Sequence, residues 1–339
     1  MNQQLKRRIL IVVCVILAVI LALLLALTIG INVFLNKIPR YDPDQFALSE
    51  DEIQQIIQET DPAEELEGLK EVKPEEVTMP SEPAQAIEET DHIFNILLIG
   101  QDRRPGQGRQ RSDAMILCTV NTEKKTLVMT SFLRDTYITM PDYQGVAYDD
   151  NRLNACYVFG GMEMLNDAME MNFGVVVDHN IEVDFSGFEN VVNAFGGVGI
   201  YLSAAEAAHM GGGLKEGWNH LNGAQALAYS RIRAIDGDAN RTGRQRKVLM
   251  ALFENVRNLN YDKLDDLVNT VLPMVTTDMT NADILKYMAE FFPILKDLQI
   301  TTQYIPVDGT YQNVMIRGMS VKLPDLEANR EILRQTIGE

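Results

Sequence analysis

The sequence has few of the residues that bind transition metals. Its 339 residues include four histidines and three cysteines. The histidines, at His92, His179, His209 and His220, show no paired metal-ligand spacing, and each is better interpreted as a lone surface or capping residue. The sequence therefore argues against a zinc site.

The scarcity of cysteine also limits the possible crosslinks. Cys14 lies in a long apolar run, which leaves Cys118 in a predicted strand and Cys156 in a predicted helix. A disulfide between these two fits an oxidising compartment, while two buried free thiols explain the sequence equally well. Both alternatives stay open.

Basic residues are outnumbered, with 30 Lys and Arg against 48 Asp and Glu and a net charge of −18. An acidic chain is a poor partner for nucleic acid. The charge is uneven: about +5 over residues 1–40, about −15 over 41–91 and about −8 over the remainder. With 46% apolar residues the chain can bury a sizeable core, in one large domain or two smaller ones.

Residues 9–35 form an apolar run long enough to cross a bilayer with some tilt. The run is too long for the apolar core of a cleavable signal. Lys6, Arg7 and Arg8 precede it, and such charges stay on the cytoplasmic side. We expect a cytoplasmic tail over 1–8, a single transmembrane helix over 9–36, and everything beyond it outside the cell.

The acidic segment over residues 37–92 contains several prolines and few aromatic or branched side chains. Such a composition cannot bury enough surface to fold alone and predicts an extracellular linker. One short helix is expected over 50–59, because Ser49 and Glu52 form a capping box.

Three apolar runs, over residues 95–102, 114–120 and 126–132, predict strands, and the last two form a hairpin. The loop after the first run is rich in glycine and arginine (Arg103, Arg104, Gly106, Gly108 and Arg109), but it lacks the P-loop and dinucleotide signatures. Further along, the pattern predicts helices that open at Arg152 and over 188–199, and a strand over 181–185. The last part predicts helices from 261 and over 282–295, strands over 299–307 and 314–317, and a helix after Pro324.

Charged side chains lie where these strands begin and end. If the strand over 114–120 runs antiparallel to both neighbours, one sheet edge gathers five residues, namely Asp102, Arg111, Asp113, Arg134 and Asp135. Carboxylates beside arginines suit a hard cation such as magnesium with phosphoryl oxygens on the arginines. A structural network of salt bridges is the alternative.

A second basic group lies over residues 229–247 and contains Arg231, Arg233, Arg241, Arg244, Arg246 and Lys247. A helix from 221 is broken at 236–238, and another begins near Asn240. The second helix has an apolar stripe made of Val248, Leu249, Leu252, Phe253 and Val256.

Four residues before this stripe, Arg241, Arg244 and Gln245 occupy the core-facing side of the second helix. Buried arginines need an anionic partner, which is either a phosphate-like ligand or the internal carboxylates Asp236 and Asp238. Arg246 and Lys247 lie off the stripe and are predicted to be solvated.

Several motifs occur in one order after the apolar run: NILLIGQD, RSD, SFLRD, RLNACYVFGG, VDFSGFENVVNAFGGVGI, LNGAQALAYSRIR and GDANRTGRQR. Together they resemble the LytR-CpsA-Psr family over about residues 93–260. The resemblance implies a catalytic domain over 93–339 with a mixed central β-sheet and helices on both faces. One departure from the family pattern is Arg246, where a second glutamine is frequent.

The resemblance also implies a function. Members of this family, mainly from Gram-positive bacteria, transfer a teichoic acid or capsular glycopolymer from a polyprenyl-pyrophosphate carrier to peptidoglycan at the cell membrane. It further implies Mg²⁺ (or Mn²⁺) on Asp102 and Asp113, and pyrophosphate binding by Arg111, Arg134, Arg231, Arg233, Arg241, Arg244 and Gln245. Which carboxylate takes the acceptor proton stays open between Asp113 and Asp135 of the same charge cluster. A lipid pocket is expected from the helices over 152–173 and 188–195. A binding regulator without turnover and a hydrolase remain alternatives.

Overall fold

The computed structural model describes residues 30–80, 82–87, 90–103, 107–236, 238–258 and 269–338. The expected cytoplasmic tail and nearly all of the expected transmembrane helix lie outside these ranges, as do Arg104, Gly106 and the expected helix from 261 as far as residue 268. Within the described residues, no helix combines the length and apolar character needed to cross a membrane.

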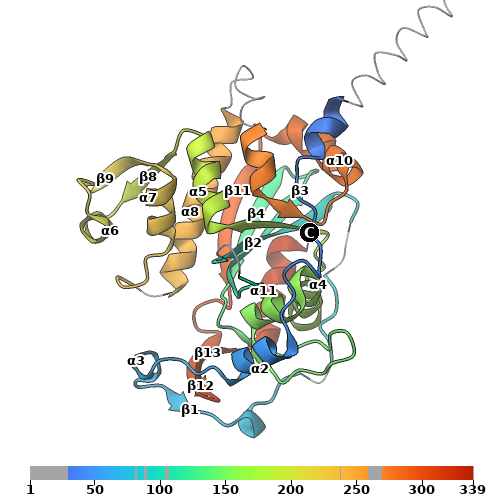
Figure 1. Ribbon diagram of the computed structural model, residues 1–339, viewed down its shortest axis with the longest axis vertical. Helices are drawn as coiled ribbons and strands as arrows, with labels where there is room; N and C mark the ends of the chain where they lie inside the picture. Colours follow the sequence, from blue (N-terminus) through green and yellow to red (C-terminus); the bar gives the residue numbers. More distant parts are fainter. Residues whose placement is uncertain are drawn as a thin grey trace, which may run out of the picture.

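A six-stranded mixed sheet forms the centre of the molecule (Figure 1). Its strands, in spatial order, are β10 (Thr276–Thr277), β7 (His179–Asp184), β2 (Ile93–Gln101), β3 (Ser112–Asn121), β4 (Thr126–Phe132) and β11 (Gln299–Ile305). β3 is antiparallel to both β2 and β4, as the sequence predicts, whereas β2 and β7, and β4 and β11, are parallel. The fold is therefore a mixed α/β fold.

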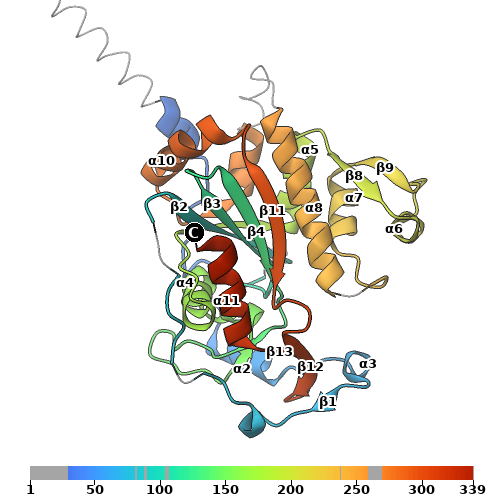
Figure 2. The same cartoon turned by 180° about the vertical axis from the view of Figure 1, so that it is seen from behind.

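Helices cover both faces of this sheet, because apolar side chains alternate along its strands. In β2, Leu97 and Ile99 face the core beneath α4 (Leu153–Phe173) and α11 (Leu326–Ile337). Phe94 faces the opposite core, which is covered by α8 (Asp238–Arg257), α10 (Asn281–Phe291) and the 3-10 turn η4 (Phe292–Ile294). Figure 2 shows α11 and α8 beside the sheet from behind. The predicted three-layer arrangement is confirmed.

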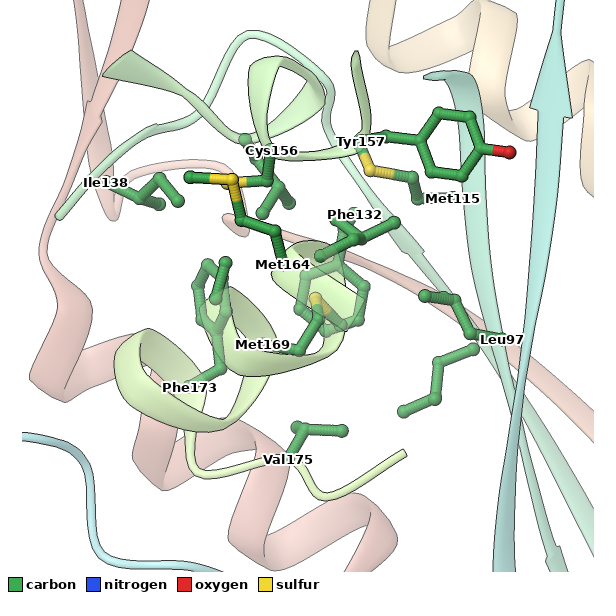
Figure 3. Close-up of a cluster of buried hydrophobic side chains, with 14 of the residues drawn as sticks. Leu97, Met115, Phe132, Ile138, Cys156, Tyr157, Met164, Met169, Phe173 and Val175 are labelled. Carbon is green, nitrogen blue, oxygen red and sulfur yellow. The ribbon is translucent and has the colours of Figure 1, made fainter. Parts of the chain in front are cut away.

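Helix α4 is buried almost all round. Met164, Met169 and Phe173 point with Leu97 and Met115 into one closely packed cluster (Figure 3). Cys156 belongs to this cluster, whereas Cys118 packs on the other face of the sheet, and both are free thiols. Burial raises the pKa of Cys118 to about 12. The sheet lies between the two sulfur atoms and keeps them apart. Of the two alternatives, the structure therefore contains two free thiols and not a disulfide.

A smaller lobe packs against α8 and has its own core. It consists of α5 (Phe185–Ala194), β8 (Val198–Leu202), α6 (Ala204–Met210), β9 (Gly217–Leu221) and α7 (Gly223–Ser230). The stripe on α8 is divided between two cores, since Val248 and Leu252 face this lobe and Phe253 faces the main sheet. The β8–β9 hairpin was not predicted from the sequence.

The expected linker is largely packed on the domain. Its helix α2 (Glu50–Gln58) has the predicted capping box, and it is followed by α3 (Ala63–Leu66), β1 (Lys70–Glu71) and the 3-10 turn η1 (Pro74–Glu76). β1 joins β12 (Tyr311–Ile316) and β13 (Met319–Pro324) in a three-stranded sheet. The prediction of a spacer was wrong because apolar residues of this segment pack against the cores of the domain. The segment therefore needs no core of its own.

One close contact shows how this segment is fixed. The amide of Met162 donates a hydrogen bond to the Tyr41 hydroxyl at 3.2 Å. At Gly161 the backbone φ is +64°, and a Cβ there would lie 1.9 Å from that hydroxyl. Glycine is therefore required at this turn of α4.

The remaining short elements complete the fold. β5 (Tyr137–Ile138) pairs with β6 (Asn151–Arg152), and η3 (Leu272–Met274) precedes β10. The predicted helix over 282–295 is present as α10 and η4, and the predicted strands over 299–307 and 314–317 correspond to β11 and β12.

Candidate active site

The predicted gathering of charge at one sheet edge is present. Asp102 follows β2, Asp113 is the second residue of β3, and Arg134 and Asp135 follow β4. The Arg134 guanidinium lies 2.6 Å from the Asp113 carboxylate and 3.3 Å from that of Asp135. The antiparallel pairing of β3 with both neighbours produces this arrangement, as expected.

Two further arginines reach this edge from the loop between α7 and α8. Helix α7 ends at Ser230, so Arg231 and Arg233 are freed from helical geometry and can approach the same site. Arg231 lies 3.9 Å from Asp102, and Arg233 lies 3.8 Å from Asp113. Both side chains are substantially exposed.

Arg241 approaches Asp113 from the first turn of α8. Its guanidinium lies 3.9 Å from the carboxylate and donates a hydrogen bond of 3.4 Å to the backbone carbonyl of Asp113. The residue is only 2% exposed. Four arginines thus meet the carboxylates of Asp102, Asp113 and Asp135, and we call Arg134, Arg231, Arg233 and Arg241 the arginine cluster. Its net positive charge suits an anionic ligand.

Arg244 lies elsewhere, although the sequence places it on the same stripe. It is buried and donates to Glu206 of α6 at 2.8 Å and to both carboxylate oxygens of Asp236 at 2.7 and 2.6 Å. Its remaining donor reaches the Ile232 carbonyl at 3.1 Å. Burial lowers the pKa of Arg244, but the hydrogen bonds that it donates to Asp236 and Glu206 raise it overall. Arg244 therefore forms internal salt bridges, which is one of the two alternatives that the sequence left open. Its contacts with Ile232 and Asp236 fix the loop that carries Arg231 and Arg233.

The prediction that Arg246 is solvated was wrong. The residue is 8% exposed, and its guanidinium lies 5.7 Å from the centre of the Tyr304 ring on β11. Burial lowers the pKa of Arg246. Helix α8 is covered by the main sheet as well as by the smaller lobe, so a position off the predicted stripe is also buried. Lys247 is exposed, as predicted.

Arg111 is bound to the N-terminal segment. Its guanidinium lies 2.9 Å from the Glu59 carboxylate and donates to the Ile56 carbonyl at 3.3 Å. Burial lowers the pKa of Arg111. Sequence reasoning missed Glu59 because it regarded this segment as a spacer.

Asp135 is enclosed by arginines. Besides Arg134, the Arg152 guanidinium lies 3.5 Å away, and Arg152 also binds Asp61 at 2.7 Å. Burial raises the pKa of Asp135, but the charges of Arg134 and Arg152 lower it overall. Such a carboxylate is a weak proton acceptor.

Two pockets meet at this site. The polar pocket, of about 440 Å³, is lined by Asp102, Asp113 and Arg111 together with Ile56, Glu59, Gln107, Gln110 and Val158. Two part-exposed carboxylates beside one open space fit Mg²⁺, which takes one or two protein carboxylates and leaves its other positions to water and phosphate. The described residues contain no cluster of three or more potential ligand side chains.

The apolar pocket, of about 130 Å³, lies between the sheet and the smaller lobe. Its walls are formed by Leu98, Ile116, Phe185, Phe188, Leu227 and Leu249, and Asp113, Arg231 and Gln245 are also among its lining residues. The Gln245 side-chain oxygen is buried and has no hydrogen-bond partner among the described residues. Helix α5 lines this pocket, whereas α4 does not line it and packs into the core on the other face of the sheet (Figure 3).

The family model LytR_cpsA_psr matches residues 54–336. The chain therefore belongs to the LytR-CpsA-Psr family. It is 32% identical over 232 residues to the polyisoprenyl-teichoic acid–peptidoglycan teichoic acid transferase TagU of Enterococcus faecalis, covering 65% of this chain and 74% of TagU. It is 28% identical over 228 residues to the regulatory protein MsrR of Staphylococcus aureus, covering 66% and 68%.

Solved structures agree with this assignment. The crystal structure of TagT from Bacillus subtilis superposes with a TM-score of 0.58 at 25% identity, covering 76% of this chain and 97% of TagT. TagT bound to LI-WTA superposes with a TM-score of 0.59, again at 25% identity, covering 77% and 98%. The mixed α/β fold with its central sheet is thus the fold of this family.

Proposed function

We propose that this protein transfers a glycopolymer, such as teichoic acid or capsular polysaccharide, from a polyprenyl-pyrophosphate carrier to peptidoglycan. The products are a phosphodiester on the wall and polyprenyl phosphate. The observation that carries this proposal is the place of the arginine cluster, which lies where an apolar pocket and a polar pocket meet at Asp113. A substrate made of a lipid, a pyrophosphate and a glycan needs an apolar, a cationic and a polar environment in that order. The apolar pocket, the arginine cluster and the polar pocket provide them.

The apolar pocket suits the part of the lipid next to the pyrophosphate. Its apolar walls adjoin Arg231 and Asp113, so an isoprenyl unit held there would lie beside the charged groups, with the rest of the long chain outside the pocket. The Arg231 guanidinium lies 4.6 Å from the centre of the Phe185 ring, so one residue contacts both the apolar wall and the charged cluster. The unpartnered Gln245 oxygen can accept a hydrogen bond from a bound molecule.

The arginine cluster is suited to hold the pyrophosphate. During transfer the polymer-side phosphorus is attacked by a sugar hydroxyl of peptidoglycan, the bond to the bridging oxygen breaks, and polyprenyl phosphate leaves with the negative charge. Arg134, Arg231, Arg233 and Arg241 stabilise that charge from fixed positions, which costs little reorganisation. Arg111 lines the polar pocket beside Asp113 and can contact the pyrophosphate from there.

We propose that Asp102 and Asp113 hold Mg²⁺ or Mn²⁺ in the polar pocket. The ion would neutralise charge on the pyrophosphate and so assist its departure. Asp135 is a weak proton acceptor because its pKa is lowered, and it does not line the polar pocket, whereas Asp113 does. The loose transition state of phosphoryl transfer needs little base assistance.

We also propose that a single membrane span over 9–36 anchors the domain outside the cell. This topology is supported by the apolar run and by its preceding basic residues. It places both the lipid carrier and the peptidoglycan within reach of the site.

Purified protein, a polyprenyl-pyrophosphate glycan and peptidoglycan fragments test this function together. We expect polyprenyl phosphate and glycan-bearing peptidoglycan to form in equal amounts, as measured by mass spectrometry. Release of lipid without attachment to the acceptor would identify a hydrolase. Tight lipid binding without any product would identify a binding regulator.

A further inference from the structure

The structure contains another large pocket, of about 640 Å³, that the proposed reaction does not use. We call it the α2 pocket, because Glu50, Gln54 and Ile57 of α2 form one of its sides. The loop over residues 143–151 and Phe159 of α4 form the others. Its volume is in the range of about 300–1,000 Å³ that ligand sites occupy.

One side of the α2 pocket carries the half-buried Tyr148 ring, which is backed by the buried ring of Phe159. The rings of Tyr148 and Phe159 are stacked, with their centres 5.2 Å apart and their planes inclined by 12°. Side chains that carry hydrogen-bonding groups also line the pocket: Glu50, Gln54, Gln144 and Asn151, together with the charged Asp44, Arg109, Asp149 and Arg317. An aromatic face edged by amides and carboxylates suits a sugar ring, whose C–H face stacks on the aromatic plane while its hydroxyls bind the polar groups.

The rim of the pocket is held by a tight turn. Tyr143 and Val146 exchange two backbone hydrogen bonds, of 3.0 and 2.9 Å, across Gln144 and Gly145. Both central residues have positive φ, +50° at Gln144 and +79° at Gly145. Positive φ at both central residues is the usual geometry of a two-residue turn that joins antiparallel segments. The turn fixes the Gln144 backbone at the edge of the pocket.

The α2 pocket is a close neighbour of the proposed active site. Gln54 and Ile57 of α2 line the α2 pocket, whereas Ile56 of the same helix and Glu59, the residue that follows it, line the polar pocket, so the last turn of α2 lies between the two spaces. In α4, Val158 lines the polar pocket and the next residue, Phe159, lines the α2 pocket. An α-helix with its side chains is about 10 Å across, which a chain of a few sugar units can span.

We infer that the α2 pocket is a saccharide subsite, which binds one or two sugar rings of a glycan whose reacting end lies in the polar pocket. This inference rests on the proposed function, because that function supplies two glycans: the polymer being transferred and the peptidoglycan acceptor. Both glycans would present sugar rings with hydroxyl groups to the pocket. The binding and transfer experiments below distinguish the two.

Calorimetric titration of the full chain in detergent tests binding directly. The two probes are a peptidoglycan-derived disaccharide and a lipid-free fragment of the glycopolymer. We expect one of them to bind, and Tyr148→Ala to weaken that binding about tenfold through loss of the aromatic ring. Gln54→Ala, an exposed change that leaves the core intact, should weaken it several-fold. Tyr148→Phe keeps the ring and should bind as the wild type does.

Trp218→Ala is the matched control, because it removes an aromatic side chain that is 78% exposed on β9, outside this pocket. It should leave binding unchanged. Binding by neither probe, or equal binding by wild type and Tyr148→Ala, would overturn the inference.

Steady-state transfer identifies the source of the sugar. An increase in KM for peptidoglycan in Tyr148→Ala assigns the subsite to the acceptor, and an increase in KM for the lipid-linked glycan assigns it to the donor, with kcat retained in each case. Unchanged KM values in an active Tyr148→Ala protein would refute the subsite while the proposed function stands. A wild-type protein that transfers no glycan would refute the proposed function itself.

Discussion

Replacing Arg244 with alanine separates two roles that the sequence and the structure give this residue. The family resemblance implies that Arg244 binds pyrophosphate, whereas the structure shows a guanidinium bound on three sides by Glu206, Asp236 and the Ile232 carbonyl. If the structural role is the main one, Arg244→Ala should lower the stability of the protein more than it lowers affinity for the lipid.

The magnitude follows from what the substitution leaves behind. Glu206 is 6% exposed and would lose its charged partner, and removing one member of a buried ion pair costs about 3–5 kcal/mol. Asp236 is more exposed and can be rehydrated, so we expect the lower end, about 3 kcal/mol. Globular domains have about 5–15 kcal/mol of stability, so the variant should fold but unfold at a lower denaturant concentration.

The pH dependence gives an independent check. Burial raises the pKa of Glu206, but hydrogen bonds from the Ser203 amide and from Arg244 lower it overall. A carboxyl group whose pKa is lowered by folding stabilises the folded state at pH values above its ordinary pKa, which is about 4.5 for Glu206. This stabilisation is lost as the pH falls through the lowered pKa. The stability difference between wild type and Arg244→Ala should therefore be largest near neutral pH and shrink in acid.

Urea unfolding followed by circular dichroism measures these differences, with Lys247→Ala as an exposed control on the same helix. The control should stay within about 0.5 kcal/mol of wild type. If Arg244→Ala were as stable as this control while losing as much lipid affinity as Arg241→Ala, Arg244 would be a direct ligand and our account of it would be wrong.

Three other predictions concern the ligand, the pH and the membrane. Arg241→Ala should weaken binding of a polyprenyl pyrophosphate by about 1.5–3 kcal/mol, as measured by equilibrium titration, whereas Arg246→Ala should change it little; equal losses would indicate a general cationic surface. The hydrogen bond that the His179 ring donates to the Asp278 carboxylate raises the pKa of His179, so this pair should stabilise the fold below about pH 6.5 and less as the pH rises through the raised pKa. The unfolding free energy of His179→Gln should thus differ from wild type more at about pH 5.5 than at about pH 8.5, and an equal difference at both would contradict the assignment. Protease added to protoplasts should remove residues beyond about 36, and protection of the domain would refute the external location.

Local patterns in the sequence were sufficient for much of the fold. The apolar runs of β2, β3 and β4 and the short turn between the last two fix an antiparallel pairing, and that pairing alone brings Asp102, Asp113 and Arg134 to one edge. The apolar stripe of α8 likewise placed Arg241 on the buried side. These predictions depend only on residues that are near one another in the chain.

The remaining features depend on partners that are distant in sequence. Arg244 is bound by Glu206, 38 residues earlier, and Arg246 is covered by Tyr304 of β11. Glu59 lies in a segment whose composition alone predicts a spacer, yet the segment packs on the domain and reaches Arg111. Periodicity describes the face of one helix and cannot show which other elements cover it.

The central claim is that Asp113 lies at the point where the arginine cluster, the apolar pocket and the polar pocket meet and that transfer takes place there. The most direct measurement is the rate of glycan transfer from a polyprenyl-pyrophosphate carrier to peptidoglycan by purified Asp113→Ala protein, with its fold verified by circular dichroism. We predict that the substitution abolishes metal-dependent transfer. Transfer at the wild-type rate and with the same magnesium dependence would contradict this account.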